Sequence, residues 1–131
     1  MRRLRLLGDR RGVGAIEFGL SAPLVIIMVV GIAQLGTLFA ANAGLQHAVD
    51  EGARLATIYP RPSDASIIAL INQKKFRLAS NLITGPTLTH DTTAAGAPYV
   101  DITMSYSVPL NFVLFTTPAI TLTQTRRAYQ F

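Results

Sequence analysis

The sequence contains no cysteine among its 131 residues, which excludes disulfide bonds and thiolate metal sites. Its two histidines, His47 and His90, belong to no spaced set of His, Asp and Glu that resembles a metal site, so each is interpreted as a surface or capping residue. Serines and aspartates occur without a nucleophile motif, and the glycines do not gather into a phosphate-binding loop. We therefore expect a protein that is not an enzyme and that has no cofactor, no metal and no small-molecule substrate.

Charged residues are also missing from a long internal stretch, because no Asp, Glu, Lys or Arg occurs from Phe18 to Val49. This stretch exceeds the roughly 20 residues that a helix needs to cross about 30 Å of hydrocarbon, and its most apolar part comes first. We predict one long helix over residues 13–59, transmembrane at about 16–36, which continues out of the bilayer. Pro23 removes one backbone N–H inside the run and predicts a bend without a break.

The positive charge of the chain is concentrated at its start. Residues 1–12 hold five arginines and one aspartate, and so carry most of the net charge of +5. This asymmetry predicts a cytoplasmic N-terminus, with residues 34–131 across the membrane. The later basic pairs, Lys74/Lys75 and Arg126/Arg127, lack interleaved aromatic residues or a motif, so we expect no nucleic-acid partner.

The junction between the basic leader and the apolar run is unlike that of an ordinary signal peptide, since no short apolar core with an A-x-A cleavage site follows. Instead, Arg10-Arg11-Gly12 precedes four small or apolar residues, Glu17-Phe18, a proline and the hydrophobic helix. This arrangement resembles the TadE-like pseudopilins of tight-adherence (Flp/Tad) pilus systems. The similarity continues into the segment from Glu51 to Arg54, and it covers about half of the chain well and the rest in outline.

The resemblance implies that a prepilin peptidase cuts between Gly12 and Val13. Gly8 and Gly14 are competing positions, but only Gly12 makes Glu17 the fifth residue of the mature chain. It further implies a minor pilin-like subunit in the bacterial inner membrane, with a single pass and a periplasmic or extracellular head. The implied partners are the lipid bilayer, other pilin and pseudopilin subunits, and the inner-membrane assembly platform.

Two other classes of protein remain open from the sequence. One is an unprocessed accessory or scaffold protein of an export machine, whose glycine is never cut. The other is a small membrane-bound module whose head binds an exported ligand. An intact N-terminus would favour the first alternative, and a deep polar pocket in the head would favour the second.

Glu17 stands alone between the arginines and the uncharged run. A carboxylate in or beside the hydrocarbon costs roughly 2.5 to 3.5 kcal/mol unless it finds a partner. The pilin resemblance implies that Glu17 pairs with the new amine of Val13 on a neighbouring subunit, with Phe18 as part of the same assembly element. The alternative is that Glu17 sits at the headgroup level and reaches water.

Small residues recur at every fourth position through the second half of the predicted helix. This small-residue ridge consists of Gly36, Ala40, Gly44, Ala48, Gly52 and Ala56. Such a ridge allows another helix to approach closely, so we interpret it as an assembly surface. The alternative is that the ridge packs under the chain's own head, as we expect for the neighbouring leucines and Val49.

Residues 60–131 have the composition of a small head, which together with the helix predicts an α+β fold. Ser63 is a suitable N-cap for a helix over residues 64–83, on which Lys74, Lys75 and Arg77 should point mostly outward. A loop with a short strand at 87–89 follows. Strict alternation predicts strands at 100–108 and 119–129, paired antiparallel in a two- to three-stranded sheet. Their connection, residues 109–118, is unusually apolar; its Phe112, Val113, Leu114 and Phe115 meet either a partner, lipid or the chain's own core.

Overall fold

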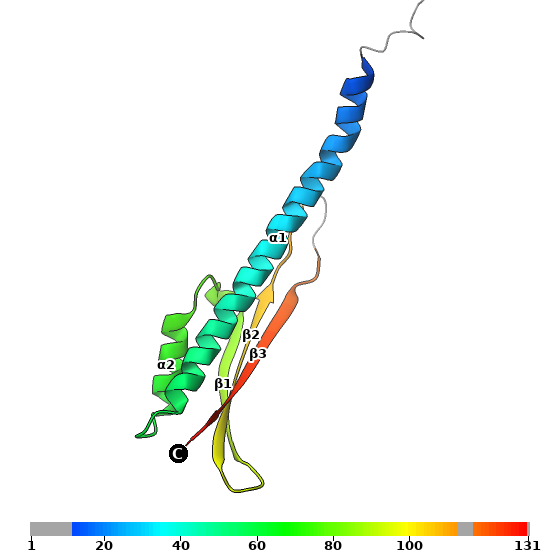
Figure 1. Ribbon diagram of the computed structural model, residues 1–131. Coiled ribbons are helices and arrows are strands. Elements are labelled where there is room, and N and C mark those ends of the chain that lie inside the picture. Colours follow the sequence, from blue (N-terminus) through cyan, green and yellow to red (C-terminus); the bar gives the residue numbers. More distant parts are fainter. Residues whose placement is uncertain (1–11, 113–116, 131) are drawn as a thin grey trace, which may run out of the picture.

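The computed structural model describes residues 12–112 and 117–130. In order, the elements are α1 (Val13–Ala56), α2 (Asp64–Lys74), the 3₁₀ helix η2 (Ser80–Leu82), β1 (Ile83–Thr92), β2 (Pro98–Val108) and β3 (Ile120–Tyr129). Figure 1 shows α1 as a long rod whose second half packs with α2 and the sheet, while its N-terminal part projects beyond them. The predicted α+β fold, with a long apolar N-terminal helix and a small antiparallel sheet, is confirmed.

The sheet has the order β1-β2-β3, with both pairs antiparallel. Alternation along β2 buries Val100, Ile102 and Met104 against the helices and leaves the residues between them on the outer face. On that outer face, serine and threonine hydroxyls pair across β2 and β3, as in Thr103–Thr125 at 3.0 Å. The predicted pairing of two alternating strands is therefore correct.

The core lies between the sheet and one side of the two helices. Leu45 and Val49 of α1, Ile67 and Ile71 of α2, and Met104 of β2 are completely buried there. Burying each such side chain contributes roughly 1.5 to 3 kcal/mol. This packing fixes the second half of α1 to the head, so that both move as one body.

Two predicted boundaries in the head are wrong. The helix predicted over residues 64–83 ends at Lys74, after which the chain turns sharply, with Arg77 at a φ of +56°. The strand predicted at 87–89 is the ten-residue β1, because the backbone of this Thr-rich segment pairs with the edge of β2. In both places a contact with a distant part of the chain decides the local structure.

The described ends of the apolar connection between β2 and β3 fold back onto α1. Leu110 is buried, and the side-chain amide of Gln34 donates to the Asn111 carbonyl at 2.8 Å. A Cβ placed on Gly31 would lie 3.9 Å from the ring of Phe112, which packs against the core. Val113, Leu114 and Phe115 lie outside the described residues. The connection thus contacts α1 at residues 31–34, within the predicted membrane span.

Candidate assembly surface

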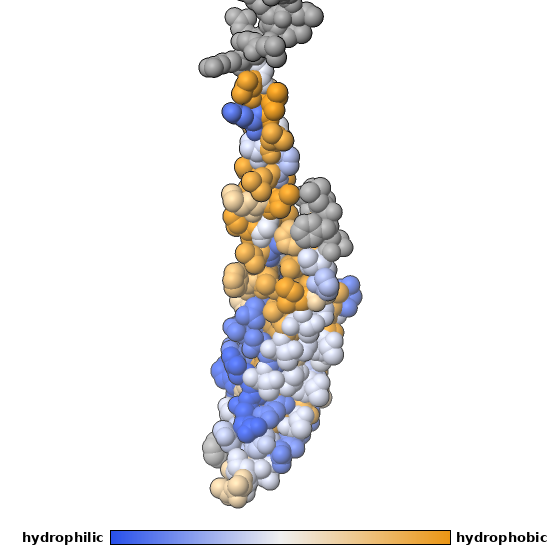
Figure 2. Space-filling model, turned by 90° about the vertical axis from the view of Figure 1, so that its right-hand side faces the viewer, coloured by the Kyte–Doolittle hydropathy of each residue, from blue (hydrophilic) through white to orange (hydrophobic). Residues whose placement is uncertain are grey.

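From Val13 to Phe39, α1 presents exposed apolar side chains. Twelve large hydrophobic residues are exposed in this part of the helix: Val13, Ile16, Phe18, Leu20, Leu24, Val25, Ile26, Met28, Val29, Ile32, Leu35 and Phe39. Figure 2 shows this hydrophobic surface along the projecting half of the molecule, above a more polar head. Within the described ranges, α1 is the one helix long and apolar enough to cross a membrane. It has the length and composition of a membrane anchor.

The predicted cleavage site lies at the start of this helix. Gly12 is the N-cap residue of α1, and Val13 is the first helical residue. Among the described residues, no atom outside the adjacent backbone lies within 4 Å of a Cβ placed on Gly12 or on Gly14. The proposed new N-terminus would therefore coincide with the first residue of α1. Gly8 lies outside the described residues.

Glu17 lies one helical turn beyond Val13 and is exposed. Within the described part of the chain its carboxylate has no hydrogen bond or ion pair, and the Phe18 beside it is 72% exposed. The Ser21 hydroxyl donates to the backbone carbonyl of Glu17, one turn earlier in the helix, at 2.8 Å. This bond lies in the part of α1 where Pro23 lacks a backbone N–H. The helix continues through Pro23, and the Glu17 carboxylate remains available to another molecule.

The small-residue ridge is divided between two surroundings. Gly44, Ala48, Gly52 and Ala56 are buried under the chain's own head. A Cβ on Gly44 would lie 2.2 Å from the carbonyl oxygen of Phe76, and a Cβ on Gly52 would lie 2.5 Å from the side chain of Ile71. These four residues therefore pack under the chain's own head, which was the alternative interpretation of the ridge. The head covers the surface that a neighbouring helix would have to contact.

Gly36 and Ala40 are the two ridge residues that the head does not bury. They line an open hollow of about 540 Å³ together with Ala33, Thr37 and Arg77. The part of the ridge that a second molecule can contact is therefore confined to its end nearest the apolar half of α1. The nearby Arg77 was not identified from the sequence, because the predicted helix over 64–83 turned it outward.

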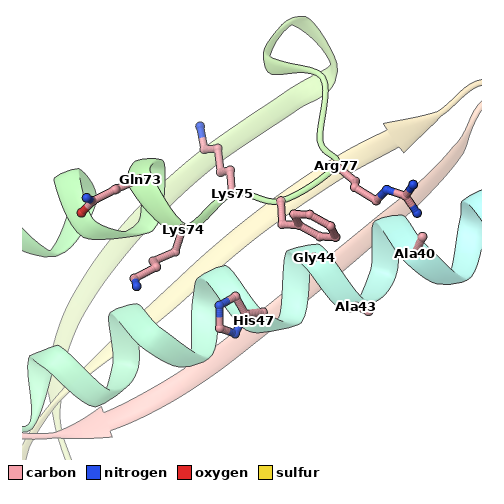
Figure 3. Close-up of a pocket in the computed structure, with 9 residues that line it drawn as sticks. Ala40, Ala43, Gly44, His47, Gln73, Lys74, Lys75 and Arg77 are labelled. Atoms are coloured by element: carbon pink, nitrogen blue, oxygen red, sulfur yellow. The ribbon is translucent and has the colours of Figure 1, made fainter.

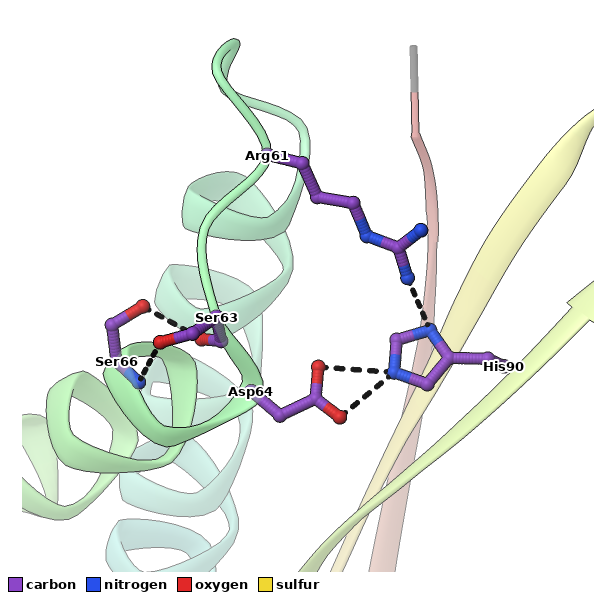
Figure 4. Close-up of polar contacts among 5 residues, drawn as sticks. All are labelled: Arg61, Ser63, Asp64, Ser66 and His90. Carbon is purple, nitrogen blue, oxygen red and sulfur yellow. Dashed lines mark hydrogen bonds and ion pairs between the residues drawn. The ribbon is translucent and has the colours of Figure 1, made fainter.

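His90 acts as a structural contact between α2 and β1. Figure 4 shows its ring between Asp64, the first residue of α2, and Arg61. The Arg61 guanidinium is a donor, so His90 Nδ1 accepts at 2.9 Å, and Nε2–H donates to the Asp64 carboxylate at 2.9 Å. Ser63 caps α2 by accepting from the Ser66 N–H at 3.3 Å, as predicted. Among the described residues, no group of three His, Asp or Glu could hold a metal.

A second polar group lies on the outer face of the sheet. Arg127 donates two hydrogen bonds to Asp101, each at 2.8 Å, and its guanidinium lies 3.8 Å from the centre of the Tyr99 ring. These bonds lower the pKa of Asp101 below its ordinary value of 3.8, against the opposing effect of partial burial. For Tyr99, burial and then its bond to Asp91 raise the pKa of the phenol.

Because the pKa of Asp101 is lower in the folded state, its bond to Arg127 stabilises the fold above the ordinary pKa of 3.8. That contribution is lost as the pH falls through the lower, folded-state pKa. We expect Asp101→Asn to reduce the free energy of unfolding at pH 7, and this difference from the wild type should shrink as the pH falls below 3.8. Denaturant unfolding of the full chain over a series of pH values measures this. Arg127→Gln should show the same reduced pH dependence; a full pH dependence in that variant would contradict the assignment.

Comparison with known proteins bears on the N-terminal segment. The family model described as TadE-like protein matches residues 12–54, which confirms the resemblance found in the sequence. No curated protein and no solved structure matches the chain. The matched segment contains Gly12, Glu17 and Phe18 and all of the small-residue ridge except Ala56. The match shows that residues 12–54 are similar to the corresponding segment of TadE-like proteins.

Proposed function

We propose that this chain, whose residues 12–54 match the family model of TadE-like proteins, is a minor pilin-like subunit that is anchored in the bacterial inner membrane and takes part in Tad pilus assembly. The observation that carries the proposal is the uncovered apolar half of α1, which continues without interruption into the half that is packed in the head. The role is non-enzymatic. The N-terminus lies in the cytoplasm and the head in the periplasm or outside the cell.

Anchoring in the membrane is supported by the free energy that it would cost to leave the apolar part of α1 in water. Each large apolar side chain left in water forgoes roughly 1.5 to 3 kcal/mol, and twelve of them are exposed on α1 between Val13 and Phe39. Residues 16–36 would span about 30 Å at 1.5 Å per residue, which matches the hydrocarbon thickness. The bilayer can cover most of this surface, since the described part of the head contacts the span only near residues 31–34.

Assembly is supported by the exposed carboxylate of Glu17. In the membrane an unpaired carboxylate is costly, and within the described residues this chain supplies no partner for it. Cleavage before Val13 would create a positive amine at nearly the same depth on a neighbouring subunit. Pairing of the two would neutralise both charges as subunits, brought together by the assembly platform, pack side by side.

The experiment that tests the proposal is a mass measurement of the native protein extracted from membranes. A chain cleaved by the prepilin peptidase starts at Val13, and Gly12→Asp should accumulate with residues 1–12 attached, because the added side chain and charge block entry to the peptidase. Gly14→Ala is the matched control and should be cleaved normally, since Gly14 is as open as Gly12. An uncleaved wild-type chain in cells with an active peptidase would favour the scaffold alternative.

A further inference from the structure

A groove runs along one side of α1 where the head begins. Its floor consists of the small residues Gly36, Ala40 and Gly44, and its rim carries Lys74, Lys75 and Arg77. It joins two open hollows, of about 500 and 540 Å³, which share Ala40 and Arg77. We call it the basic groove.

The charge of the basic groove has one sign. Among the described residues that line it there are three cations and no carboxylate, and none of the three cations has an ion pair within that part of the chain. The nearby carboxylate of Glu51 interacts electrostatically with Lys74, but it forms an ion pair with Arg54 at 2.8 Å. Arg54 lowers the pKa of Glu51 more than Lys74 does. The groove therefore attracts anions.

The position of Arg77 is maintained against an unfavourable backbone conformation. A φ of +56° places Arg77 in the left-handed region, which residues with a Cβ rarely adopt. The turn that contains Arg77 packs against α1, where the backbone carbonyl of Phe76 approaches Gly44 closely. Figure 3 shows the Arg77 side chain extending from this turn toward Ala40, and it also lines the hollow that contains Ala33. The turn thus directs a cation toward the apolar half of α1.

The groove lies at the depth where the predicted membrane span ends. Arg77 faces residues 33–40 of α1, and the span covers about 16–36, so the guanidinium is at the level of lipid headgroups. Two exposed aromatic side chains are close to this level, Phe39 at 69% and Phe76 at 62% exposure. Basic side chains whose apolar stems lie along a helix and whose charges reach the headgroups are typical of the boundary between membrane and water.

We propose that the basic groove binds the phosphate of an anionic phospholipid in the leaflet that faces the head, with Arg77 as its principal contact. This rests on the membrane anchoring proposed above. The groove is continuous with the lipid-facing half of α1, and its charge is complementary to that of the phosphate. A second copy of α1 fits less well, since that helix is uncharged from Phe18 to Val49 and would cover Arg77 without supplying a counter-charge.

The test uses the full chain in phosphatidylcholine vesicles that contain a small fraction of spin-labelled phosphatidylglycerol or spin-labelled phosphatidylcholine. The fraction of label immobilised by the protein gives the preference for the anionic lipid. We expect Arg77→Gly and Arg77→Gln to reduce this preference about fivefold, the effect of one basic residue at an anionic surface. Arg77→Lys should retain most of it. Arg61→Gln, which removes a cation at the far end of the head, should leave it unchanged.

Arg77→Gly separates lipid binding from folding, because glycine tolerates the positive φ. We expect its thermal unfolding midpoint to be no lower than that of the wild type while the lipid preference falls. If Arg77→Gly misfolds, loss of the preference in Arg77→Gln with retention in Arg77→Lys supports the site. A chain that floats with the vesicles but shows no preference, or an equal preference in Arg77→Gln, overturns the phosphate site alone. A chain that does not float with them overturns the anchoring as well.

Discussion

Replacing Gly44 by alanine is expected to destabilise the head by about 1 to 3 kcal/mol, the usual cost of overpacking a close contact. The new methyl group would lie 2.2 Å from the Phe76 carbonyl oxygen, and since that atom belongs to the backbone the whole turn has to move. The gain in helix propensity from glycine to alanine, up to about 1 kcal/mol, offsets only part of this cost. Denaturant unfolding of the full chain in detergent measures the difference.

Gly36→Ala is the matched control on the same helix. In the described ranges, no atom outside the adjacent backbone of α1 lies within 4 Å of a Cβ placed on Gly36, so the same substitution should leave the head as stable or slightly more stable. The pair of variants also separates the two interpretations of the small-residue ridge. If Gly44→Ala unfolds like the wild type but no longer copurifies with other pilus subunits, Gly44 contacts a neighbour and the arrangement described here is wrong.

Glu17→Ala is expected to abolish incorporation into the pilus without impairing cleavage or insertion. Removing a carboxylate from the membrane makes insertion equal or slightly easier. The peptidase should still cut after Gly12, since it requires mainly the glycine and the basic leader. Assembly should fail because the Val13 amine of a neighbour would be left unpaired among apolar helices, which costs several kcal/mol. Copurification with other pilus subunits, at matched expression, measures the loss.

The series at Glu17 distinguishes charge from shape. Glu17→Gln should be nearly as damaging as alanine, whereas Glu17→Asp should retain part of the activity if its shorter arm reaches the amine. Glu51→Ala is the matched control, because it removes the other glutamate of the chain, whose ion pair with the largely exposed Arg54 contributes little to stability. Normal piliation by Glu17→Ala would mean that the carboxylate only reaches toward the headgroups.

The sequence predicts well those elements whose residue pattern is set by one uniform environment along their whole length. The apolar run in α1 is long enough to identify a membrane helix from length and charge alone. The strict alternation along β2 identifies a strand with one buried face, and its register with β3 follows from the antiparallel pairing of two such faces. Both signals are repeated over many residues, so no single contact can override them.

The turn after Lys74 could not be predicted, because it depends on a residue 32 positions earlier in the chain, Gly44, that admits the Phe76 carbonyl. Local periodicity continued the helix to residue 83 and turned Arg77 outward. Likewise, the Thr, Gly and Pro content of the segment after Leu82 is typical of a loop, and β1 forms because β2 offers it an edge to pair with.

The small-residue ridge shows the same limit in the candidate site. Spacing alone indicates that something approaches α1 closely, but it does not distinguish a neighbouring helix from the chain's own α2, which contributes Ile71 beside Gly52. Gly12, Glu17 and Phe18 were identifiable because their arrangement is local and is matched by the family model. The role of Glu17 and the cut after Gly12 remain predictions for the experiments above.

The continuity of α1 has a mechanical consequence. The helix runs from Val13 to Ala56 over 44 residues, about 66 Å at 1.5 Å per residue, and it contains no linker between the apolar half and the half under the sheet. A head on a flexible tether could keep its orientation while its anchor was raised, tilted or turned. In this chain the apolar half and the head are joined by one continuous helix, α1. A push applied along the axis at the N-terminal end of α1 therefore displaces the sheet by the same amount, and a twist of that end turns the head with it.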